Sequence, residues 1–382
     1  MNILFTSDTY HTAINGIVTH IATLKAELEK RGHTVVIVAP KYSNHQEEPN
    51  VYRLPSFSFP ARPEDSIGNF MDKKTKELLM ALDFDLVHNH TFLTGYLGTK
   101  IAKKKQIPNI ATYHTPFDQY IHRIIPGAEK PFKKPLDLLA RSFFNKFDLI
   151  LSPSPKSTIH LEEIKTKTKN LHLPNGIDLK VFKNAKKEPF LQKFKIDPKR
   201  PIITIVGRLD QGKNVELAIE AMAQVKAKMP EALLVIVGDG TTRKKCEKLV
   251  KKLNLEKNVI ITGFLDQKLV ASAHQAANLS LMLSKVDNLP TVAIEAAAAK
   301  TPLIALDDPG MKLIVSHRQN GLLVNPTKEE VTDAILFMLK DQKLLQKYGQ
   351  KSAQIAEKFS IEKYVDKLEP LYTQLISSHK QL

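Results

Sequence analysis

Short apolar runs alternate along the chain with longer stretches in which apolar residues recur every three or four positions. In the first half, the short runs predict strands at Asn2–Thr6, Thr34–Ala39, Leu86–His90, Asn109–Tyr113 and Leu149–Ser152. The longer stretches predict helices at Ile17–Arg31, Phe92–Lys105 and Pro135–Lys146. Strands that are apolar throughout and separated by helices are typical of a parallel sheet covered on both faces.

The same alternation starts again after residue 200. It predicts strands at Ile202–Val206, Leu233–Val237, Val259–Thr262, Leu279–Leu283 and Leu303–Ala305, and helices at Val215–Lys228, Thr242–Leu253, Thr291–Ala299 and Glu329–Leu339. We therefore expect an α/β protein of two Rossmann-like, doubly wound domains facing across a cleft, with ligands at the carboxyl ends of the strands. The expected domains are 1–183 and 201–360, joined by a Lys- and Pro-rich linker at 184–200. A C-terminal helix at 361–382 is expected to pack back on the first domain.

The composition fits two domains and excludes several protein classes. The chain has 382 residues, of which 42% are hydrophobic and 25% are charged, so bulk disorder is not expected. The single cysteine, Cys246, excludes an internal disulfide and suggests a reducing compartment. The N-terminus lacks the features of a signal peptide, and no stretch approaches the ~20 apolar residues that span a bilayer. We expect an intracellular protein, either soluble or peripheral.

The net charge of +16 is unevenly distributed along the chain. Residues 100–187 hold 18 Lys and Arg against 7 Asp and Glu, whereas residues 1–99 hold 9 against 11. Such asymmetry points to a nucleic acid, an anionic membrane or a phosphorylated ligand. A solvated basic face that only aids solubility is the alternative.

Two loops that follow predicted strands are candidates for phosphate binding. Gly207–Lys213 places Arg208 and Lys213 beside the start of a helix, which suits a diphosphate, although a surface turn is equally compatible. The P-loop pattern is absent, because Asn214 stands where Ser or Thr is required. The loop ending at Gly16 could also meet an anion, since glycine lets the backbone approach closely, but a simple turn glycine explains it as well.

Two carboxylates flank another junction between a strand and a helix. Asp287 precedes Asn288, Leu289, Pro290 and Thr291, and Glu295 lies about one turn into an otherwise apolar helix. A carboxylate in such a helix is costly unless it is hydrogen-bonded. Sugar or ribose hydroxyls are suitable donors; an internal partner and a general acid/base pair are the alternatives.

Several histidines end predicted strands of the first domain. His114 could bond a ligand hydroxyl or transfer a proton, or it could be a satisfied buried histidine. His88 and His90 together suggest a metal, but no cysteine or carboxylate stands at ligand spacing with them, so we expect no metal there.

Basic and apolar residues interleave between Ile121 and Phe147. The cationic side chains are Arg123, Lys130, Lys133, Lys134, Arg141 and Lys146. This composition favours a surface that lies in a membrane interface. An ordinary core helix explains several of the apolar residues, and nucleic acid is a weaker rival because no binding motif is present.

Taken together, these loops resemble the retaining GT-B glycosyltransferases of family GT4, over nearly the whole chain. The motifs are the loop ending at Gly16, RGHTVVIVAP at 31–40, DLVHNH at 85–90, PNGID at 174–178, GRLDQGKN at 207–214, VGDG at 237–240, GF at 263–264 and the pair Asp287 and Glu295. TYHTPFDQY at 112–120 looks especially like the branch that glucosylates diacylglycerol in bacterial membranes.

The resemblance implies a role for each candidate residue. Arg208 and Lys213 match the positions that hold the donor diphosphate, and Glu295 matches the one that binds the donor ribose. Asp287, with Asn288, Leu289, Pro290 and Thr291, matches the segment that contacts the transferred sugar. The remaining matches are Gly16 with the phosphate loop, His114 with the histidine beside donor sugar and acceptor, and the backbone at Phe264 and Leu265 with the base.

This sequence departs from the family pattern around its first acid. The usual Glu is Asp287, and Asn288, Pro290 and Lys300 replace usual glycines. Pro290 also removes a backbone N–H that could have bonded the sugar. Donor binding is still expected, whereas the identity of the sugar is open.

The resulting expectation is a peripheral enzyme at the cytoplasmic face of the cell membrane, which moves glucose from a UDP-sugar to diacylglycerol with retention. Arg208 and Lys213 would stabilise the leaving group, with no metal or other cofactor. The expected partners are a UDP-sugar, a lipid acceptor and an anionic membrane surface, and not a nucleic acid. Transfer to a glycolipid or a cell-wall polymer, and a non-catalytic protein that binds nucleic acid or anionic lipid, are the alternatives.

Overall fold

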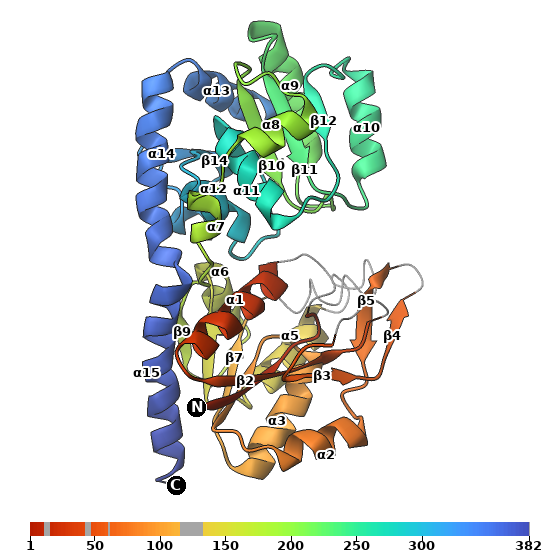
Figure 1. Cartoon of the computed structure of the whole chain (residues 1–382), viewed down its shortest axis with the longest axis vertical. Helices are drawn as coiled ribbons and strands as arrows, with labels where there is room; N and C mark the ends of the chain where they lie inside the picture. Colours follow the sequence, from red (N-terminus) through yellow and green to blue (C-terminus); the bar gives the residue numbers. More distant parts are fainter. Residues whose placement is uncertain (11–15, 43–46, 60–61, 115–132, 382) are drawn as a thin grey trace. The chain divides into compact units, whose positions relative to one another are not determined.

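The computed structural model describes residues 1–10, 16–42, 47–59, 62–114 and 133–381. The chain divides into two compact units, and each is built on its own parallel sheet (Figure 1). The first unit comprises Met1–Ile177 with Ile361–Leu382, and the second comprises Asp178–Ser360. The predicted α/β class with two Rossmann-like sheets is confirmed.

The first unit has a seven-stranded sheet in the order β3-β2-β1-β6-β7-β8-β9, and every neighbouring pair is parallel. The strands are β1 (Asn2–Thr6), β2 (Thr34–Pro40), β3 (Val51–Leu54), β6 (Leu86–Asn89), β7 (Asn109–Thr112), β8 (Leu149–Ser152) and β9 (Asn170–His172). Side chains of one strand enter two cores, because successive residues point to opposite faces. Ile3 and Phe5 pack in one cluster, and Leu4 packs in the other.

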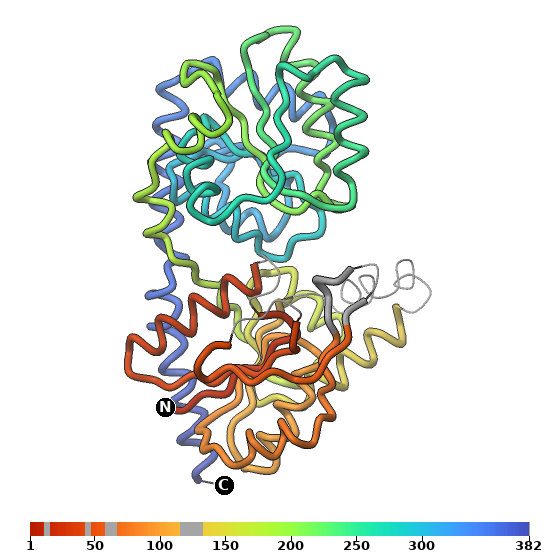
Figure 2. Tube along the Cα trace, turned by 45° about the vertical axis from the view of Figure 1, so that its right-hand side comes forward, coloured from red at the N-terminus to blue at the C-terminus, as the bar shows by residue number. Residues whose placement is uncertain are grey.

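Helices cover both faces of this sheet. They are α1 (Gly16–Lys30), α2 (Lys73–Ala81), α3 (Leu93–Lys105), α5 (Lys133–Phe144), α6 (Pro155–Glu163) and α15 (Ile361–His379). α1 and the C-terminal α15 lie side by side, as the red and blue segments of Figure 2 show. Their buried side chains share one core on this face of the sheet. Arg31, just after α1, donates hydrogen bonds to the Asp366 and Glu369 carboxylates of α15 at 2.8 Å each. These ion pairs help to hold the C-terminal helix against the first unit.

The second unit has a six-stranded parallel sheet in the order β12-β11-β10-β13-β14-β15. Its strands are β10 (Ile202–Val206), β11 (Leu233–Val237), β12 (Val259–Ile261), β13 (Leu279–Met282), β14 (Leu303–Leu306) and β15 (Gly321–Val324). Its helices are α7 (Lys180–Lys183), α8 (Glu188–Phe194), α9 (Val215–Lys228), α10 (Arg243–Lys252), α11 (Gln267–Ala276), α12 (Thr291–Ala298), α13 (Lys328–Leu339) and α14 (Gln342–Ala356), with short 3₁₀ turns at Met311–Leu313 and Glu357–Phe359.

Both sheets reverse their strand order beside their first strand. β1 lies between β2 and β6, and β10 lies between β11 and β13. In such sheets the loops on either side of the reversal diverge at the carboxyl ends of the strands and leave a crevice. Each unit therefore has one point at which a ligand site is expected.

Several features differ from the sequence-based expectation, and strands β3, β9 and β15 were not predicted. Residues 184–200 are not an extended linker, because they contain α8, whose Phe190 and Leu191 are buried in the core of the second unit. The boundary between the units accordingly falls after Ile177. An antiparallel hairpin, β4 (Ser56–Phe59) with β5 (Arg62–Gly68), is inserted between β3 and α2, where no strand was predicted.

Candidate functional site

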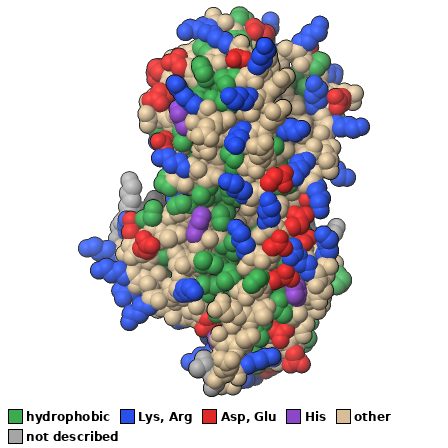
Figure 3. Space-filling view, turned by 90° about the vertical axis from the view of Figure 1, so that its left-hand side faces the viewer, with side chains coloured by type: hydrophobic (Ala, Val, Ile, Leu, Met, Phe, Trp, Pro, Cys, Tyr) green, Lys and Arg blue, Asp and Glu red, His purple; other side chains and the backbone are tan. Residues whose placement is uncertain are grey.

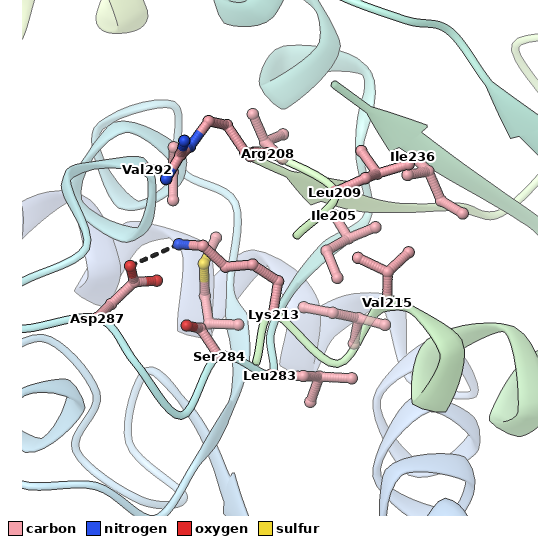
Figure 4. Close-up of a pocket in the computed structure, with 14 residues that line it drawn as sticks. Ile205, Arg208, Leu209, Lys213, Val215, Ile236, Leu283, Ser284, Asp287 and Val292 are labelled. Carbon is pink, nitrogen blue, oxygen red and sulfur yellow. Dashed lines mark hydrogen bonds and ion pairs between the residues drawn. The ribbon is translucent and has the colours of Figure 1, made fainter. Parts of the chain in front are cut away.

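A pocket in the second unit lies at the reversal between β10 and β13 (Figure 4). Its polar rim comes from two loops, with Arg208 and Lys213 after β10 and Ser284 and Asp287 after β13. The floor is apolar and is formed by Ile205, Ile236, Leu281 and Leu283. The structure thus brings together three residues that are up to 79 positions apart, Arg208, Lys213 and Asp287.

Backbone bonds tie the two loops together on either side of Lys213. The Lys285 N–H donates to the Gly212 carbonyl at 3.0 Å, and the Asn214 side-chain amide donates to the Leu283 carbonyl at 2.8 Å. Gly212 has φ of +90°, and a Cβ there would meet Val286 at 2.7 Å, so this turn requires glycine. Lys213 is therefore held over the pocket at the start of α9 by the backbone.

Both cations of the pocket are paired with carboxylates. Lys213 Nζ donates to Asp287 Oδ1 at 2.5 Å, and Arg208 Nη1 lies 3.2 Å from Asp210 Oδ2. Their side chains are 21% and 37% exposed, so a ligand in the pocket can reach them. Two cations beside the N-terminus of α9 form a suitable site for a diphosphate, and the Asp287 carboxylate can accept hydrogen bonds from hydroxyl groups.

Glu295 lies on α12 and is 8% exposed. Its Oε2 is 3.9 Å from Nε2 of His274, a fully buried residue of α11. Neither ring nitrogen of His274 has a hydrogen-bond partner among the described residues. The sequence left open whether Glu295 has an internal partner. Its neighbour is the His274 ring, which lies beyond hydrogen-bond distance. Glu295 does not line the pocket.

The loop between Asp287 and α12 is packed into the second unit. Leu289 and Pro290 are buried, and Thr291 is the first residue of α12. The Asn288 carbonyl lies so close to Gly310 that a Cβ there would be 2.4 Å from its oxygen. A side chain at position 310 would therefore displace this loop, and the partly exposed side chains of Asn288 and Thr291 are the ones that a ligand could contact.

Phe264 and Leu265 follow β12 and do not line the pocket. Phe264 is 60% exposed, whereas the Leu265 side chain packs in the core with Phe190. The preceding Gly263 carbonyl accepts a hydrogen bond from the Gly238 N–H at 3.0 Å, which joins the ends of β11 and β12. Phe264 therefore presents an aromatic ring to solvent, and Leu265 contributes to stability.

Gly16 and His114 belong to the first unit. Gly16 is exposed and is the first residue of α1, and His114 follows β7. The His114 ring lies between two polar neighbours: Nε2 is 3.1 Å from His90 Nδ1, and Nδ1 is 3.3 Å from the Asn175 side-chain amide. Burial, together with nearby His20 and His88, holds the pKa of His114 well below its usual range, so the ring is neutral at physiological pH.

The basic segment is described only from Lys133 onward, so Arg123 and Lys130 lie outside the described residues. α5 buries Ala140, Phe143 and Phe144 on its inner face. Its outer face carries Lys134, Leu138 and Arg141, which are spaced four and three residues apart. Leu138 is 65% exposed and the adjacent Leu139 is 47% exposed. In the described part of the chain, no helix is both long and apolar enough to cross a membrane.

Comparison with known proteins identifies the family. Residues 14–181 match "Glycosyltransferase Family 4", and residues 186–355 match "Glycosyl transferases group 1". An alpha-monoglucosyldiacylglycerol synthase from Streptococcus pneumoniae is 30% identical over 329 residues, which is 84% of this chain and 74% of that protein. The chain belongs to glycosyltransferase family 4. A second alpha-monoglucosyldiacylglycerol synthase, from Acholeplasma laidlawii, is 26% identical over 100% of this glycosyltransferase and 99% of its own length.

Solved structures show that this glycosyltransferase has the GT-B fold. The sucrose-phosphate synthase of Thermosynechococcus elongatus superposes with a TM-score of 0.79 at 22% identity, over 99% of each chain. Anabaena HepE in complex with UDP-glucose also gives 0.79, at 17% identity over 98% of this chain and 100% of that one. The non-catalytic alternative is excluded, because the family consists of glycosyltransferases.

Sequence reasoning missed several polar residues of this glycosyltransferase. His20 on α1, Asn175 before the end of the first unit and His274 on α11 were not expected near any candidate residue. The helical spacing of His20 and His274 marks both as inward-facing, but an inward histidine is usually only a packed core residue. They contact their neighbours only through the tertiary packing of elements that are distant in sequence.

Proposed function

We propose that this glycosyltransferase moves glucose from UDP-glucose to diacylglycerol at the cytoplasmic face of the cell membrane and forms an α-glucosyl lipid with retention. The observation that carries the proposal is the convergence of Arg208, Lys213 and Asp287 in the pocket at the strand reversal. The names of the two related synthases support the choice of sugar and acceptor.

In the proposed reaction, the free hydroxyl of diacylglycerol attacks C1 of glucose. The new C1–O bond forms as the bond between C1 and the β-phosphate oxygen breaks, and the hydroxyl proton leaves with the departing UDP. Arg208 and Lys213 stabilise the negative charge that develops on the diphosphate, which is usually the largest contribution to catalysis. The positive charge of these two side chains makes a metal ion at the diphosphate unnecessary.

The remaining residues bind and orient the two substrates. In the proposal, Asp287 and the backbone of Asn288–Thr291 bind glucose hydroxyls, and Glu295 accepts hydrogen bonds from the ribose. Phe264 and the backbone at Leu265 contact the uracil, and the first unit contributes Gly16 and His114. For Asp287 to bind glucose, its contact with Lys213 must loosen, and the incoming diphosphate provides Lys213 with a replacement partner.

Attachment to the membrane is proposed to use the outer face of α5, defined by Lys134, Leu138 and Arg141. Exposed leucines between cationic side chains suit the boundary between lipid headgroups and acyl chains. Each Lys or Arg near an anionic leaflet contributes about 1 kcal/mol. On the face of the protein drawn in Figure 3, basic side chains are scattered over both units among acidic ones, so a general charge effect is the alternative that must be tested.

The function is tested by incubating the protein with UDP-[¹⁴C]glucose and vesicles of anionic phospholipid that contain diacylglycerol. We expect a radioactive lipid to form with the wild-type protein and with Lys285→Ala, an exposed lysine near the pocket that does not line it. Label in an added glycosylated lipid, but not in diacylglycerol, would reassign the acceptor. No labelled product with any UDP-sugar would contradict the proposal.

The membrane contact is tested by reversing three charges on α5. Lys133→Glu/Lys134→Glu/Arg141→Glu should lose most of its flotation with anionic vesicles, because about 3 kcal/mol of attraction turns into repulsion. The matched control, Lys244→Glu/Lys248→Glu/Lys251→Glu, changes the net charge equally on α10 of the second unit. Equal loss in both triple variants would show that α5 is not the contact surface.

A further inference from the structure

One buried histidine of the second unit lies beside the carboxylate that is proposed to bind the donor ribose. His274, on α11, is fully buried, and its Nε2 is 3.9 Å from Oε2 of Glu295 on α12. We propose that His274 is a positioning residue, which donates a hydrogen bond from Nε2 to Glu295 when the donor nucleotide binds. The proposal rests on the proposed contact of Glu295 with the ribose and adds the residue that orients this carboxylate.

Both partners of this contact are polar groups that the described part of the chain leaves unsatisfied. Neither ring nitrogen of His274 has a hydrogen-bond partner there, and the Glu295 carboxylate accepts no hydrogen bond from a residue in that part. Buried polar groups are normally hydrogen-bonded, because burial without a partner costs free energy. Each group can satisfy the other, since an imidazole with a proton on Nε2 donates and a carboxylate accepts.

Hydrogen bonds of the surrounding residues hold His274 in this place. The hydroxyl of Thr301, which follows α12, donates to the His274 carbonyl at 2.7 Å. The Gln275 side-chain amide donates to the Phe182 carbonyl of α7 at 2.8 Å, and the Phe182 ring packs against the imidazole with centroids 6.2 Å apart. α11 is therefore fixed against both α7 and α12, so the flexible Glu295 side chain is the partner that can move.

A small movement converts the contact into a hydrogen bond. An N–H···O bond has a length of about 2.9 Å, so Oε2 of Glu295 must approach Nε2 of His274 by ~1 Å. The Glu295 side chain is 11% exposed, which leaves an opening through which a ligand hydroxyl can reach it. With Oε2 held by His274, Oε1 has a fixed direction for the ribose hydroxyls, and less side-chain freedom is lost on binding.

The test measures the binding of UDP by isothermal titration calorimetry, with 2′,3′-dideoxy-UDP as the probe that lacks both ribose hydroxyls. His274→Phe keeps a ring but has no N–H, so the Kd for UDP should rise roughly tenfold, whereas the Kd for the dideoxy probe should stay within about twofold of wild type. His274→Gln keeps an N–H near the position of Nε2 and should restore most of the UDP affinity.

The matched control is Ser272→Ala, at another buried position of α11. The Ser272 hydroxyl donates to the Lys186 carbonyl at 2.6 Å and accepts from the Phe190 N–H at 3.1 Å, so its loss should lower the Tm. The Kd of this variant for UDP should equal that of wild type, which separates general damage to α11 from an effect on the donor ribose.

Two results would overturn the proposal. One is an unchanged Kd for UDP in His274→Phe, and the other is an equal loss for UDP and the dideoxy probe, because a structural defect weakens both. If circular dichroism shows that His274→Phe does not fold, His274→Asn replaces it, since the shorter amide does not reach the position of Nε2. Failure of both variants to fold would show a structural role and also overturn the proposal.

The proposed function and this inference can fail separately. Wild-type protein that binds UDP and the dideoxy probe equally would contradict the ribose contact of Glu295 itself. A ribose preference that persists in His274→Phe would contradict only the role of His274. UDP binding does not involve the acceptor, so an error in the proposed transfer to diacylglycerol would leave all of these results unchanged.

Discussion

Replacing Lys213 by alanine separates the electrostatic role of the pocket from its structural role. The substitution removes a cation that faces the proposed diphosphate and leaves the Asp287 carboxylate without the partner it contacts at 2.5 Å. The backbone bonds that hold the loop, from Lys285 to Gly212 and from Asn214 to Leu283, do not involve the Lys213 side chain. The loop should therefore keep its conformation in the variant.

The structure gives different magnitudes for the two effects. At 2.5 Å and an effective dielectric constant of about 20, the attraction between Lys213 and Asp287 is about 6–7 kcal/mol. Most of this is offset by lost hydration, and a pair that retains 21% and 26% exposure contributes about 1 kcal/mol net. In a unit of this size the loss corresponds to a fall in Tm of about 2–4 °C. Loss of one charge-stabilising group in the transition state typically lowers kcat ~10²–10³-fold.

The assay is steady-state glucosyl transfer from UDP-glucose, together with thermal unfolding of the same preparations. Lys213→Ala should lower kcat ~10²–10³-fold while its Tm falls by only a few degrees. Lys285→Ala should match the wild-type protein in both measurements. A kcat within threefold of wild type would remove Lys213 from the catalytic machinery, and an unfolded variant at the assay temperature would show that the ion pair is mainly structural.

Three further predictions concern other parts of the structure. Gly238→Ala should destabilise the second unit by at least ~3 kcal/mol, because φ is +143° and the new Cβ would lie 1.9 Å from the Gly207 carbonyl oxygen; an unchanged Tm would contradict this. Glu295→Ala should raise the KM for UDP-glucose ~10–100-fold through the loss of charged hydrogen bonds with little change in kcat, and steady-state kinetics with an equal KM would exclude a ribose contact. Acid should destabilise the first unit, because burial lowers the pKa of His20 to about 4, so the unfolded chain binds more protons below pH ~6.5. Up to about 3 kcal/mol is then lost as the pH falls from ~6.5 to ~4, and acid unfolding that is no less steep in His20→Gln would refute the assignment.

The position of the pocket at the strand reversal could be predicted from the sequence, because it depends on the order of the strands. Arg208 and Asp287 are 79 positions apart, but each follows a strand of a doubly wound sheet, and β10 and β13 are neighbours at the reversal. Once the alternation of strands and helices is recognised, the loops after these strands must lie at one edge of the sheet. The same reasoning predicted most of the strands, because their apolar runs are largely buried in both sheets.

The sequence did not predict which side chains of different elements come into contact. Which nitrogen of His20 is bonded depends on the Gly176 carbonyl, 156 residues away, and no periodicity encodes that contact. His274 likewise meets Glu295 only because α11 and α12 pack together. The sequence did not predict α8 for a different reason: the lysines that surround it suggested a linker. Its few apolar residues are nevertheless enough for this short helix to bury Phe190 and Leu191.

The chemical identity of the lipid product distinguishes glucosyl transfer to diacylglycerol from every other outcome. The purified protein is supplied with UDP-[¹³C]glucose and diacylglycerol in anionic vesicles, and the extracted lipid is analysed by mass spectrometry and by NMR of the anomeric centre. We expect diacylglycerol that carries one hexose in the α configuration. A β-linked product would contradict retention, and unmodified diacylglycerol beside labelled free glucose or another labelled acceptor would contradict the proposed transfer.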